Sequence, residues 1–154
     1  MEKEHQTEEI TSTFKLRQGT PEDCELMFRL QKLDGAELNQ SDLDQISNFE
    51  EYKKEFKPTE IQVVYFNDQP VGRLRIVRED DIYIGGMQIL PEYRGGGLGT
   101  MILASLIEES KETLKSIRLE VFHNNFQALS LYEKTGFRVV DETEYKKIML
   151  YEPS

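Results

Sequence analysis

The segment that most constrains this chain lies at 94–99, where an arginine and four glycines separate a β-type segment from an amphipathic helix. Glycine lets the backbone adopt left-handed conformations and lets a ligand approach without meeting a Cβ. The first turn of a helix adds unpaired N–H groups and positive dipole character. The segment therefore predicts an anion site of the kind that holds phosphate groups, with Arg94 as a fixed cation.

Spacing excludes two familiar phosphate loops. A P-loop needs a lysine directly after its last glycine, and no lysine lies between Lys57 and Lys111. The pattern G-x-G-x-x-G fails because Thr100 and Ile102 occupy the positions where its third glycine would stand. A glycine-rich turn before an ordinary helix is the plain alternative at this point.

Composition narrows the class of protein. The 154 residues, 38% apolar and 31% charged, fit one globular domain. We expect a flexible acidic tail over 1–13 and a single domain over 14–154. A net charge of −10 disfavours nucleic-acid binding. With Cys24 as the only cysteine, we expect no disulfide and no metal site, and a cytoplasmic location. No apolar run is long enough for a membrane helix.

Hydrophobic periodicity gives the elements. Strands are predicted at 14–17, 61–66, 71–77, 82–90, 117–122, 137–140 and 145–151, and helices at 21–33, 41–56, 98–114 and 128–135. Residues 67–70 read as the turn of a hairpin. Gly85 and Gly86, inside a predicted strand, indicate a bulge or a close approach of another group to the backbone.

Two motifs together resemble a known family. Arg94-x-x-Gly97-x-Gly99 resembles the R/Q-x-x-G-x-G/A signature of the GNAT-type N-acetyltransferase superfamily, and the segment from Asn125 to Phe137 resembles its N-x-x-A-x-x-L-Y-x-x-x-G-F segment. The resemblance covers about 14–151. It implies an α+β (mixed α/β) fold: a central mixed, mostly antiparallel sheet of about seven strands, with helices on both faces and a splay between strands four and five.

The resemblance also implies how the cosubstrate acetyl-CoA is held in that splay. Backbone groups of Met87, Gln88 and Ile89 would bind the pantetheine arm, and Asn125 would close the site from the other side. The pyrophosphate would lie on the loop and first helical turn, made of Arg94, Gly95, Gly96, Gly97, Leu98, Gly99 and Thr100.

Two residues are the candidate catalytic groups. Tyr132 matches the family's general acid, although its helical spacing from Ala128 and Leu131 also fits a core aromatic. Glu120 resembles the paired glutamate of ribosomal-protein N-terminal acetyltransferases. Because side chains alternate along a strand, Glu120 is expected on the face opposite to that of Leu119 and Val121. There it lies either beside the acceptor or simply in solvent. His123 is a further candidate base or a surface histidine.

The resulting hypothesis is transfer of the acetyl group from acetyl-CoA to a primary amine of a small molecule, protein or peptide. The alternative is a non-catalytic acyl-CoA-binding module with a regulatory or interaction role on the same fold. The sequence leaves the acceptor and the acyl-chain preference open, and exposed sheet edges permit a homodimer. Asp34, Glu37, Asp42 and Asp44 could attract a cationic amine or form a solvated helix surface.

Overall fold

The computed structural model describes residues 14–33 and 49–154. These residues form a seven-stranded sheet in the order β1-β2-β3-β4-β5-β7-β6. The strands are β1 (Phe14–Gln18), β2 (Ile61–Phe66), β3 (Gln69–Arg78), β4 (Ile82–Ile89), β5 (Ile117–Phe122), β6 (Arg138–Glu142) and β7 (Lys146–Tyr151). Every neighbouring pair is antiparallel except β4 and β5, which are parallel. The predicted mixed, mostly antiparallel sheet is therefore confirmed.

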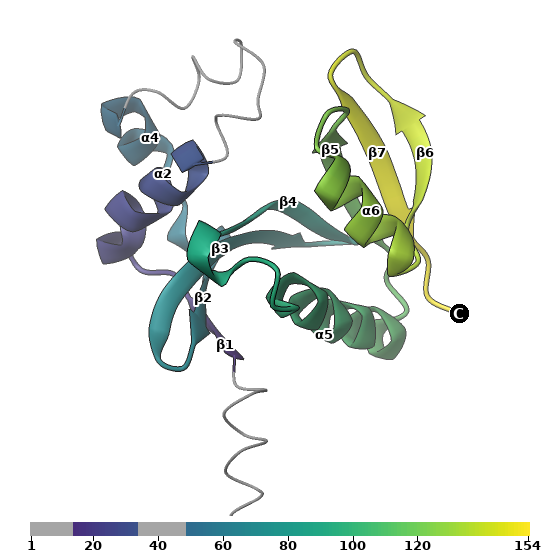
Figure 1. Ribbon diagram of the computed structural model, residues 1–154, viewed down its shortest axis with the longest axis horizontal. Helices are drawn as coiled ribbons and strands as arrows, with labels where there is room; N and C mark the ends of the chain where they lie inside the picture. The colour runs from purple at the N-terminus through teal and green to yellow at the C-terminus, as the bar shows by residue number, and fades with distance from the viewer. Residues whose placement is uncertain (1–13, 34–48) are drawn as a thin grey trace, which may run out of the picture.

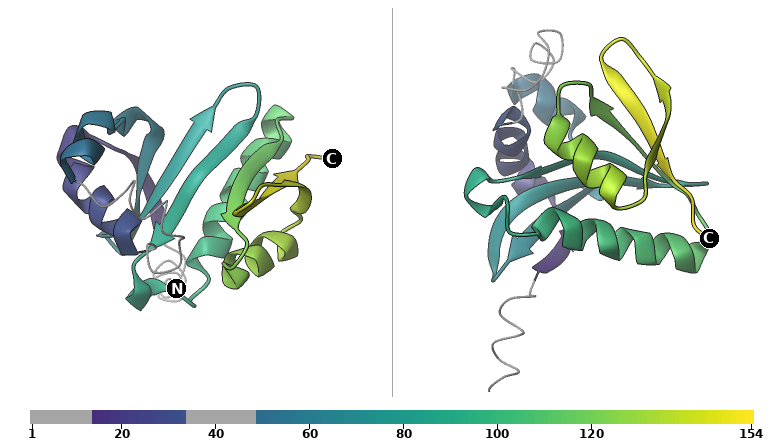
Figure 2. Two further views of the ribbon diagram at one scale, coloured as in Figure 1. Left: turned by 90° about the horizontal axis from the view of Figure 1, so that it is seen from above. Right: turned by 45° about the vertical axis from the view of Figure 1, so that its right-hand side comes forward.

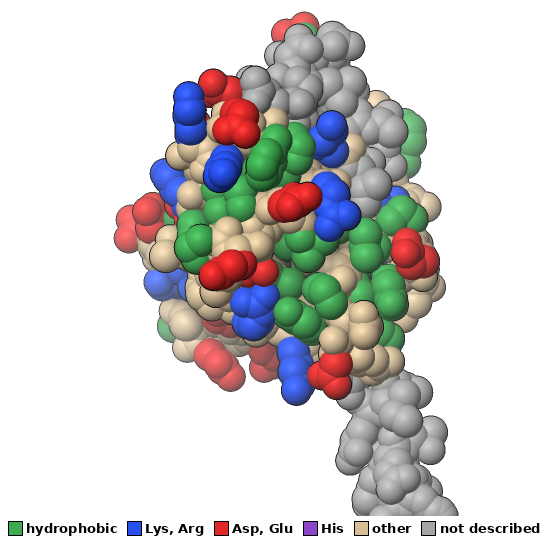
Figure 3. Space-filling model, turned by 90° about the vertical axis from the view of Figure 1, so that its left-hand side faces the viewer, with side chains coloured by type: hydrophobic (Ala, Val, Ile, Leu, Met, Phe, Trp, Pro, Cys, Tyr) green, Lys and Arg blue, Asp and Glu red, His purple; other side chains and the backbone are tan. Residues whose placement is uncertain are grey.

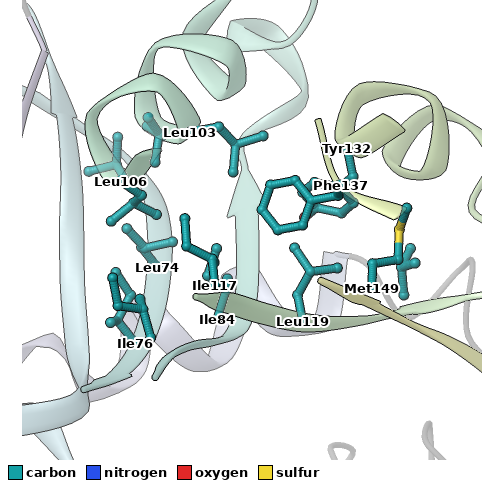
Figure 4. Packing of buried hydrophobic residues seen from close by; sticks show 14 of the residues in the cluster. Leu74, Ile76, Ile84, Leu103, Leu106, Ile117, Leu119, Tyr132, Phe137 and Met149 are labelled. Atoms are coloured by element: carbon teal, nitrogen blue, oxygen red, sulfur yellow. The ribbon is translucent and has the colours of Figure 1, made fainter. Parts of the chain in front are cut away.

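Helices cover both faces of the sheet (Figures 1 and 2). On one face lie α5 (Leu98–Thr113) and α6 (Phe126–Lys134), and on the other lie α2 (Cys24–Leu33) and α4 (Phe49–Glu55). Each side has its own hydrophobic cluster. Figure 4 shows the larger one, in which Leu103 and Leu106 of α5 pack over the sheet, and Tyr132 of α6 lies beside Phe137 above Leu119.

The parallel ladder between β4 and β5 is short. It joins only Ile82 to Ile117, Tyr83 to Arg118 and Ile84 to Leu119. Beyond these pairs β4 continues along β3 to Ile89, whereas β5 continues along β7 to Phe122. The predicted splay between strands four and five is therefore confirmed, and it opens directly after Ile84.

The bulge predicted at Gly85 and Gly86 is also confirmed. Arg75 of β3 pairs with Gly86 and the next residue, Ile76, pairs with Ile84, so Gly85 is the extra residue in β4. A Cβ on Gly85 would collide with Nη1 of Arg75, and a Cβ on Gly86 would lie 2.7 Å from Nη1 of Arg73. The two glycines thus leave room for two guanidinium groups that reach across from β3.

Several predicted boundaries were wrong by a few residues. The hairpin turn is only Asn67 and Asp68, both with positive φ, because a two-residue turn of this type matches the twist of the strands; Pro70 already belongs to β3. The helix α6 begins at Phe126, two positions before the predicted start, because Asn125 caps it. Before α2, the predicted first turn is a 3-10 helix over Pro21–Asp23.

Two predicted segments fall partly or wholly beyond what the structure describes. The acidic tail, 1–13, lies outside the described residues. So does the first half of the helix predicted at 41–56, whose second half is α4. The division into a tail and one domain stays a prediction.

On the side of the molecule where α2 and α4 lie, acidic, basic and apolar side chains are interspersed (Figure 3). None of the helices among the described residues combines the length and apolar character needed to span a bilayer.

Candidate active site

A cavity of about 160 Å³ lies where β4 and β5 diverge; we call it the splay cavity. Its walls come from the end of β4, the glycine loop and α6. The residues that line it are Met87, Gln88, Ile89, Arg94, Gly99, Asn125, Gln127, Ala128, Leu131 and Tyr132. The structure thus brings seven of the predicted site residues, far apart in sequence, to one cavity: Met87, Gln88, Ile89, Arg94, Gly99, Asn125 and Tyr132.

The free edge of β4 supplies backbone groups toward this cavity. Leu90 N donates to Val71 O of β3 at 2.9 Å. Because successive strand residues direct their N–H and C=O groups to opposite edges, the backbone groups of Met87 and Ile89 point away from β3, toward the gap, and those of Gln88 point to β3. The backbone groups of Met87 and the N–H of Ile89 can therefore bond an amide-containing chain that lies along the gap, as a missing strand would.

The glycine loop joins β4 to α5 through a 3-10 turn over Pro91–Tyr93. Gly95 and Gly97 adopt φ values of 83° and 89°, a left-handed conformation that is unfavourable for residues with a Cβ. The first amide bonded within α5 is that of Met101, which donates to Gly97 O at 3.0 Å. The amides of Leu98, Gly99 and Thr100 therefore have no acceptor within the helix, and they form the donor set expected for a phosphate.

Arg94 is fixed to the end of β4. Its Nε donates to Ile89 O at 2.8 Å, which closes the loop onto the strand. Arg94 lines the splay cavity and also a second hollow of about 210 Å³ on the other side of the loop, with Phe66, Tyr93 and Met101. Arg94 therefore borders both hollows.

Asn125 and Tyr132 come from α6. The Asn125 side-chain oxygen accepts from Ala128 N at 3.2 Å, so this residue caps the helix as well as lining the cavity. Tyr132 is 7% exposed, and its ring centroid lies 5.6 Å from that of Phe137. Tyr132 is thus both a core aromatic and a wall of the cavity, so the two interpretations of its helical spacing are compatible.

Glu120 lies on the opposite face of the sheet from α6. Its neighbours Leu119 and Val121 are buried in the main core, whereas the Glu120 side chain is 32% exposed, with its Oε1 3.6 Å from Lys146 Nζ. Glu120 is the first residue of β5 after the last pair with β4, so its side chain stands where the gap opens. It does not line the splay cavity.

A polar group that the sequence analysis missed shares this face with Glu120. The guanidinium carbon of Arg118 lies 4.5 Å from the centre of the Tyr83 ring in β4. The pKa of the Tyr83 hydroxyl is raised, mainly by burial and also by the negative charge of Glu120. Farther along the sheet, Arg73 and Arg75 lie over the paired glycines of β4. Their alternate positions in β3 predict side chains that face solvent. The only feature of the sequence that indicates another role is the pair Gly85 and Gly86 in the neighbouring strand.

The remaining candidates are placed elsewhere or not described. His123 is held at the start of the β5–α6 turn, with Nε2 3.0 Å from Thr143 O in the β6–β7 turn. Asp34, Glu37, Asp42 and Asp44 lie outside the described residues. Within 14–33 and 49–154, no three His, Cys, Asp or Glu side chains are grouped so as to hold a metal ion.

Comparison with known proteins gives one family. Residues 25–137 match the model of the acetyltransferase (GNAT) family. The probable N-acetyltransferase san of Drosophila melanogaster is 34% identical over 96 residues, which are 56% of this chain and 52% of that protein. The spermine/spermidine N(1)-acetyltransferase of Bacillus subtilis is 38% identical over 64 residues, 39% of this chain and 42% of that protein. The chain therefore matches about half the length of these curated relatives.

A solved structure matches over most of the chain. It is the PaiA N-acetyltransferase of Thermoplasma acidophilum, solved in complex with coenzyme A, with a TM-score of 0.70 and 18% sequence identity. The match covers 91% of this chain and 99% of that one. At this identity the likeness establishes the fold.

Proposed function

Because the chain belongs to the acetyltransferase (GNAT) family, we propose that it transfers the acetyl group of acetyl-CoA to a primary amine. The observation that carries the proposal is the splay cavity. It combines a free strand edge, a glycine loop at a helix start and a buried tyrosine in one place. The strand edge offers hydrogen-bond partners for the amides of a pantetheine arm, and the glycine loop offers N–H donors for a pyrophosphate. The tyrosine offers a proton donor for the departing thiolate.

In this proposal the cosubstrate lies along the free edge of β4. Met87 and Ile89 bond the pantetheine amides, with Gln88 lining the same wall. The pyrophosphate is held by Arg94, the loop of Gly95, Gly96 and Gly97, and the amides of Leu98, Gly99 and Thr100, while Asn125 limits the other side. The match to a structure solved with coenzyme A supports this placement.

Transfer requires the amine nitrogen to attack the thioester carbonyl carbon. A C–N bond forms, the C–S bond breaks, and the thiolate of coenzyme A leaves. Tyr132 is the proposed donor of a hydrogen bond, and late in the step a proton, to that sulfur. Since a phenol has a reference pKa of about 10 and an alkyl thiol about 8.5, complete transfer costs about 2 kcal/mol, so a strong hydrogen bond does most of the stabilisation.

Glu120 is the proposed base that takes the proton from the incoming ammonium. A lysine-type amine, with a pKa of about 10.4, is only about 0.04% neutral at pH 7, so it requires such a base. The position of Glu120 at the opening of the gap, on the face opposite α6, supports this role: the amine would arrive from one side of the sheet and the thioester from the other.

The test has two parts. Calorimetry measures acetyl-CoA binding to the folded protein, and thiol release measures turnover with a panel of polyamines, amino acids and peptides that carry free amines. Binding together with turnover on at least one amine supports the proposal. Binding with no turnover on any of them would instead indicate the non-catalytic acyl-CoA-binding module.

Two further properties belong to this proposal. A cytoplasmic location is supported by the composition and the single cysteine. A homodimer is supported by the exposed edge strand β6, in which Val139 and Val140 are 38% and 43% exposed. Chromatography with light scattering would measure the oligomeric state.

A further inference from the structure

A second and larger cavity lies on the face of the sheet opposite the splay cavity. Its volume is about 330 Å³, and we call it the arginine cavity because Arg73 and Arg75 form its floor. Gln31 of α2 and Tyr52 of α4 line it from above, and Gly85 lines it at the bulge. This volume falls in the range that takes a small organic molecule.

The two arginines are held in place differently. Arg73 is 5% exposed, and its Nη1 donates to Oε1 of Gln88 at 2.8 Å. Tyr52 lines the cavity beside Arg73; burial raises the pKa of its hydroxyl, although the charge of Arg73 and hydrogen bonding from it oppose the shift. Arg73 is therefore a buried, hydrogen-bonded group at the floor.

Arg75 is more accessible, with a side chain 35% exposed. Its Nε and Nη2 lie 3.1 and 2.9 Å from Oε1 of Glu60. This ion pair orients the guanidinium and leaves Nη1 directed over Gly85, in the space that a Cβ would fill. The bulge glycine thus keeps one edge of the Arg75 guanidinium exposed to the cavity.

The charge of the cavity is opposite to that of the chain. Its lining includes three cationic residues, Arg73, Arg75 and Lys57, against two anionic ones, Glu55 and Glu60. The chain as a whole carries −10. An excess of one positive charge in a partly enclosed space suits a monoanion, and a guanidinium fork matches a carboxylate in shape. A polyamine would meet net repulsion here.

The arginine cavity borders the same stretch of β4 as the transfer site. Gly85, which lines it, is the first residue of β4 beyond the pairing with β5. Gln88 lines the splay cavity and accepts the hydrogen bond from Arg73. A molecule in the arginine cavity therefore lies on the face from which the acceptor would approach the gap.

We infer that the acceptor is a small amine that also carries a carboxylate, and that Arg75, supported by Arg73 and Tyr52, binds this carboxylate. The inference rests on the proposed acetyl transfer and specifies its substrate class. A free amino carboxylate would place its acidic group against the exposed edge of the Arg75 guanidinium and its amine toward Glu120. Arg75 is then the residue that determines specificity, and Arg73 is a positioning residue.

The experiment compares free α-amino acids with their carboxamides as acceptors, with putrescine and spermidine alongside. The readout is kcat/KM from thiol release. We expect carboxylates to exceed their matched amides by about 10- to 100-fold, the size of a charge-assisted bidentate contact. Arg75→Gln should reduce this ratio to about one through a higher KM for the carboxylate, with kcat retained, and Arg75→Lys should give an intermediate ratio.

The matched control is Arg78→Gln, on the same strand, whose guanidinium pairs with Glu109 at 2.6 Å on the outer surface. It should leave the ratio unchanged, and thermal denaturation confirms that each variant is folded. Equal use of amides and carboxylates, a preference for polyamines, or an equal loss for all acceptors in Arg75→Gln would overturn the inference while leaving acetyl transfer intact. No turnover with any amine would overturn the proposed function itself.

Discussion

At the scale of single residues, Tyr132 lies in two environments at once. Its ring packs on Phe137 in the core, and the residue also lines the splay cavity. Tyr132→Phe keeps the ring and removes only the hydroxyl, so we expect kcat to fall by about 100-fold while the Kd for acetyl-CoA stays within about twofold. Thiol-release kinetics and calorimetry measure the two quantities. Undiminished turnover would exclude Tyr132 as the proton donor.

A second residue-scale prediction concerns the glycine loop. Gly97 has a φ of 89°, whereas Gly96 lies outside the left-handed region and a Cβ there would meet nothing within 4 Å. Gly97→Ala should therefore lower the free energy of unfolding by about 1 kcal/mol, and Gly96→Ala, the matched control, by much less. Urea denaturation measures both. Equal losses would mean that the left-handed backbone at Gly97 is not what selects glycine.

The sequence predicted some of these residues better than others. The splay-cavity residues could be identified because their motifs are local: the loop and the segment around Tyr132 each lie within a short stretch of chain. Arg73 and Arg75 could not, because their importance depends on what β4 places opposite them. Polar residues at alternate positions of a strand are normally predicted to face solvent. Only the register of β3 with Gly85 and Gly86 shows that Arg73 and Arg75 do not simply do so.

At the scale of elements, the start of α2 is tied to the sheet by Asp23. Its carboxylate accepts from Thr20 N at 2.8 Å and pairs with Arg17 of β1 at 3.0 Å. Burial acts to raise the pKa of Asp23, but the hydrogen bonds from Arg17 and Thr20 outweigh it, so the pKa is lowered. The carboxylate therefore contributes stability above its unfolded pKa of about 3.9, and this contribution is lost as the pH falls through the folded value.

Asp23→Asn should accordingly cost about 1 kcal/mol of unfolding free energy at pH 7 and much less at about pH 2.5. Urea denaturation at the two pH values measures the difference. Glu22→Gln, at the exposed neighbouring position, is the control and should change little at either pH. A loss for Asp23→Asn that is the same at both pH values would show that shape, and not charge, matters here.

Element boundaries depend on information that periodicity lacks. The predicted strand at 71–77 became β3, which starts at Gln69, because a two-residue turn leaves Pro70 free to pair with Tyr65. Similarly, α6 starts before its apolar face begins, because the cap at Asn125 defines its first turn. The splay could not follow from any local pattern, because β4 and β5 each read as an ordinary strand. It was predicted only through the family resemblance.

At the scale of the whole molecule, three residue pairs form the only ladder between the β1–β4 half of the described sheet and the β5–β7 half. A ligand that bridges the gap should therefore stabilise the region around it more than the distant strands. At about 100 times its Kd, acetyl-CoA should slow amide exchange around the gap by up to about 100-fold. We expect this for peptides covering 85–90, 95–101 and 125–129.

Hydrogen exchange followed by mass spectrometry measures this effect, with the peptide over β2 as the internal control, since β2 is two strands away from the gap. Its amides should exchange at nearly the same rate with and without the ligand. Uniform protection, or none at 95–101, would contradict the placement of the pyrophosphate on the helix start.

The extra residue at Gly85 changes which residues of β4 face the core. Before it, even-numbered residues, Ile82 and Ile84, face α5; after it, odd-numbered ones, Met87 and Ile89, do. Deleting Gly85 would reverse the faces of the distal half of β4. The polar side chain of Gln88 would then point into the hydrophobic core, and those of Met87 and Ile89 would point toward water. A one-residue deletion here should therefore be far more damaging than any single replacement, because it would exchange the inner and outer surfaces of the strand.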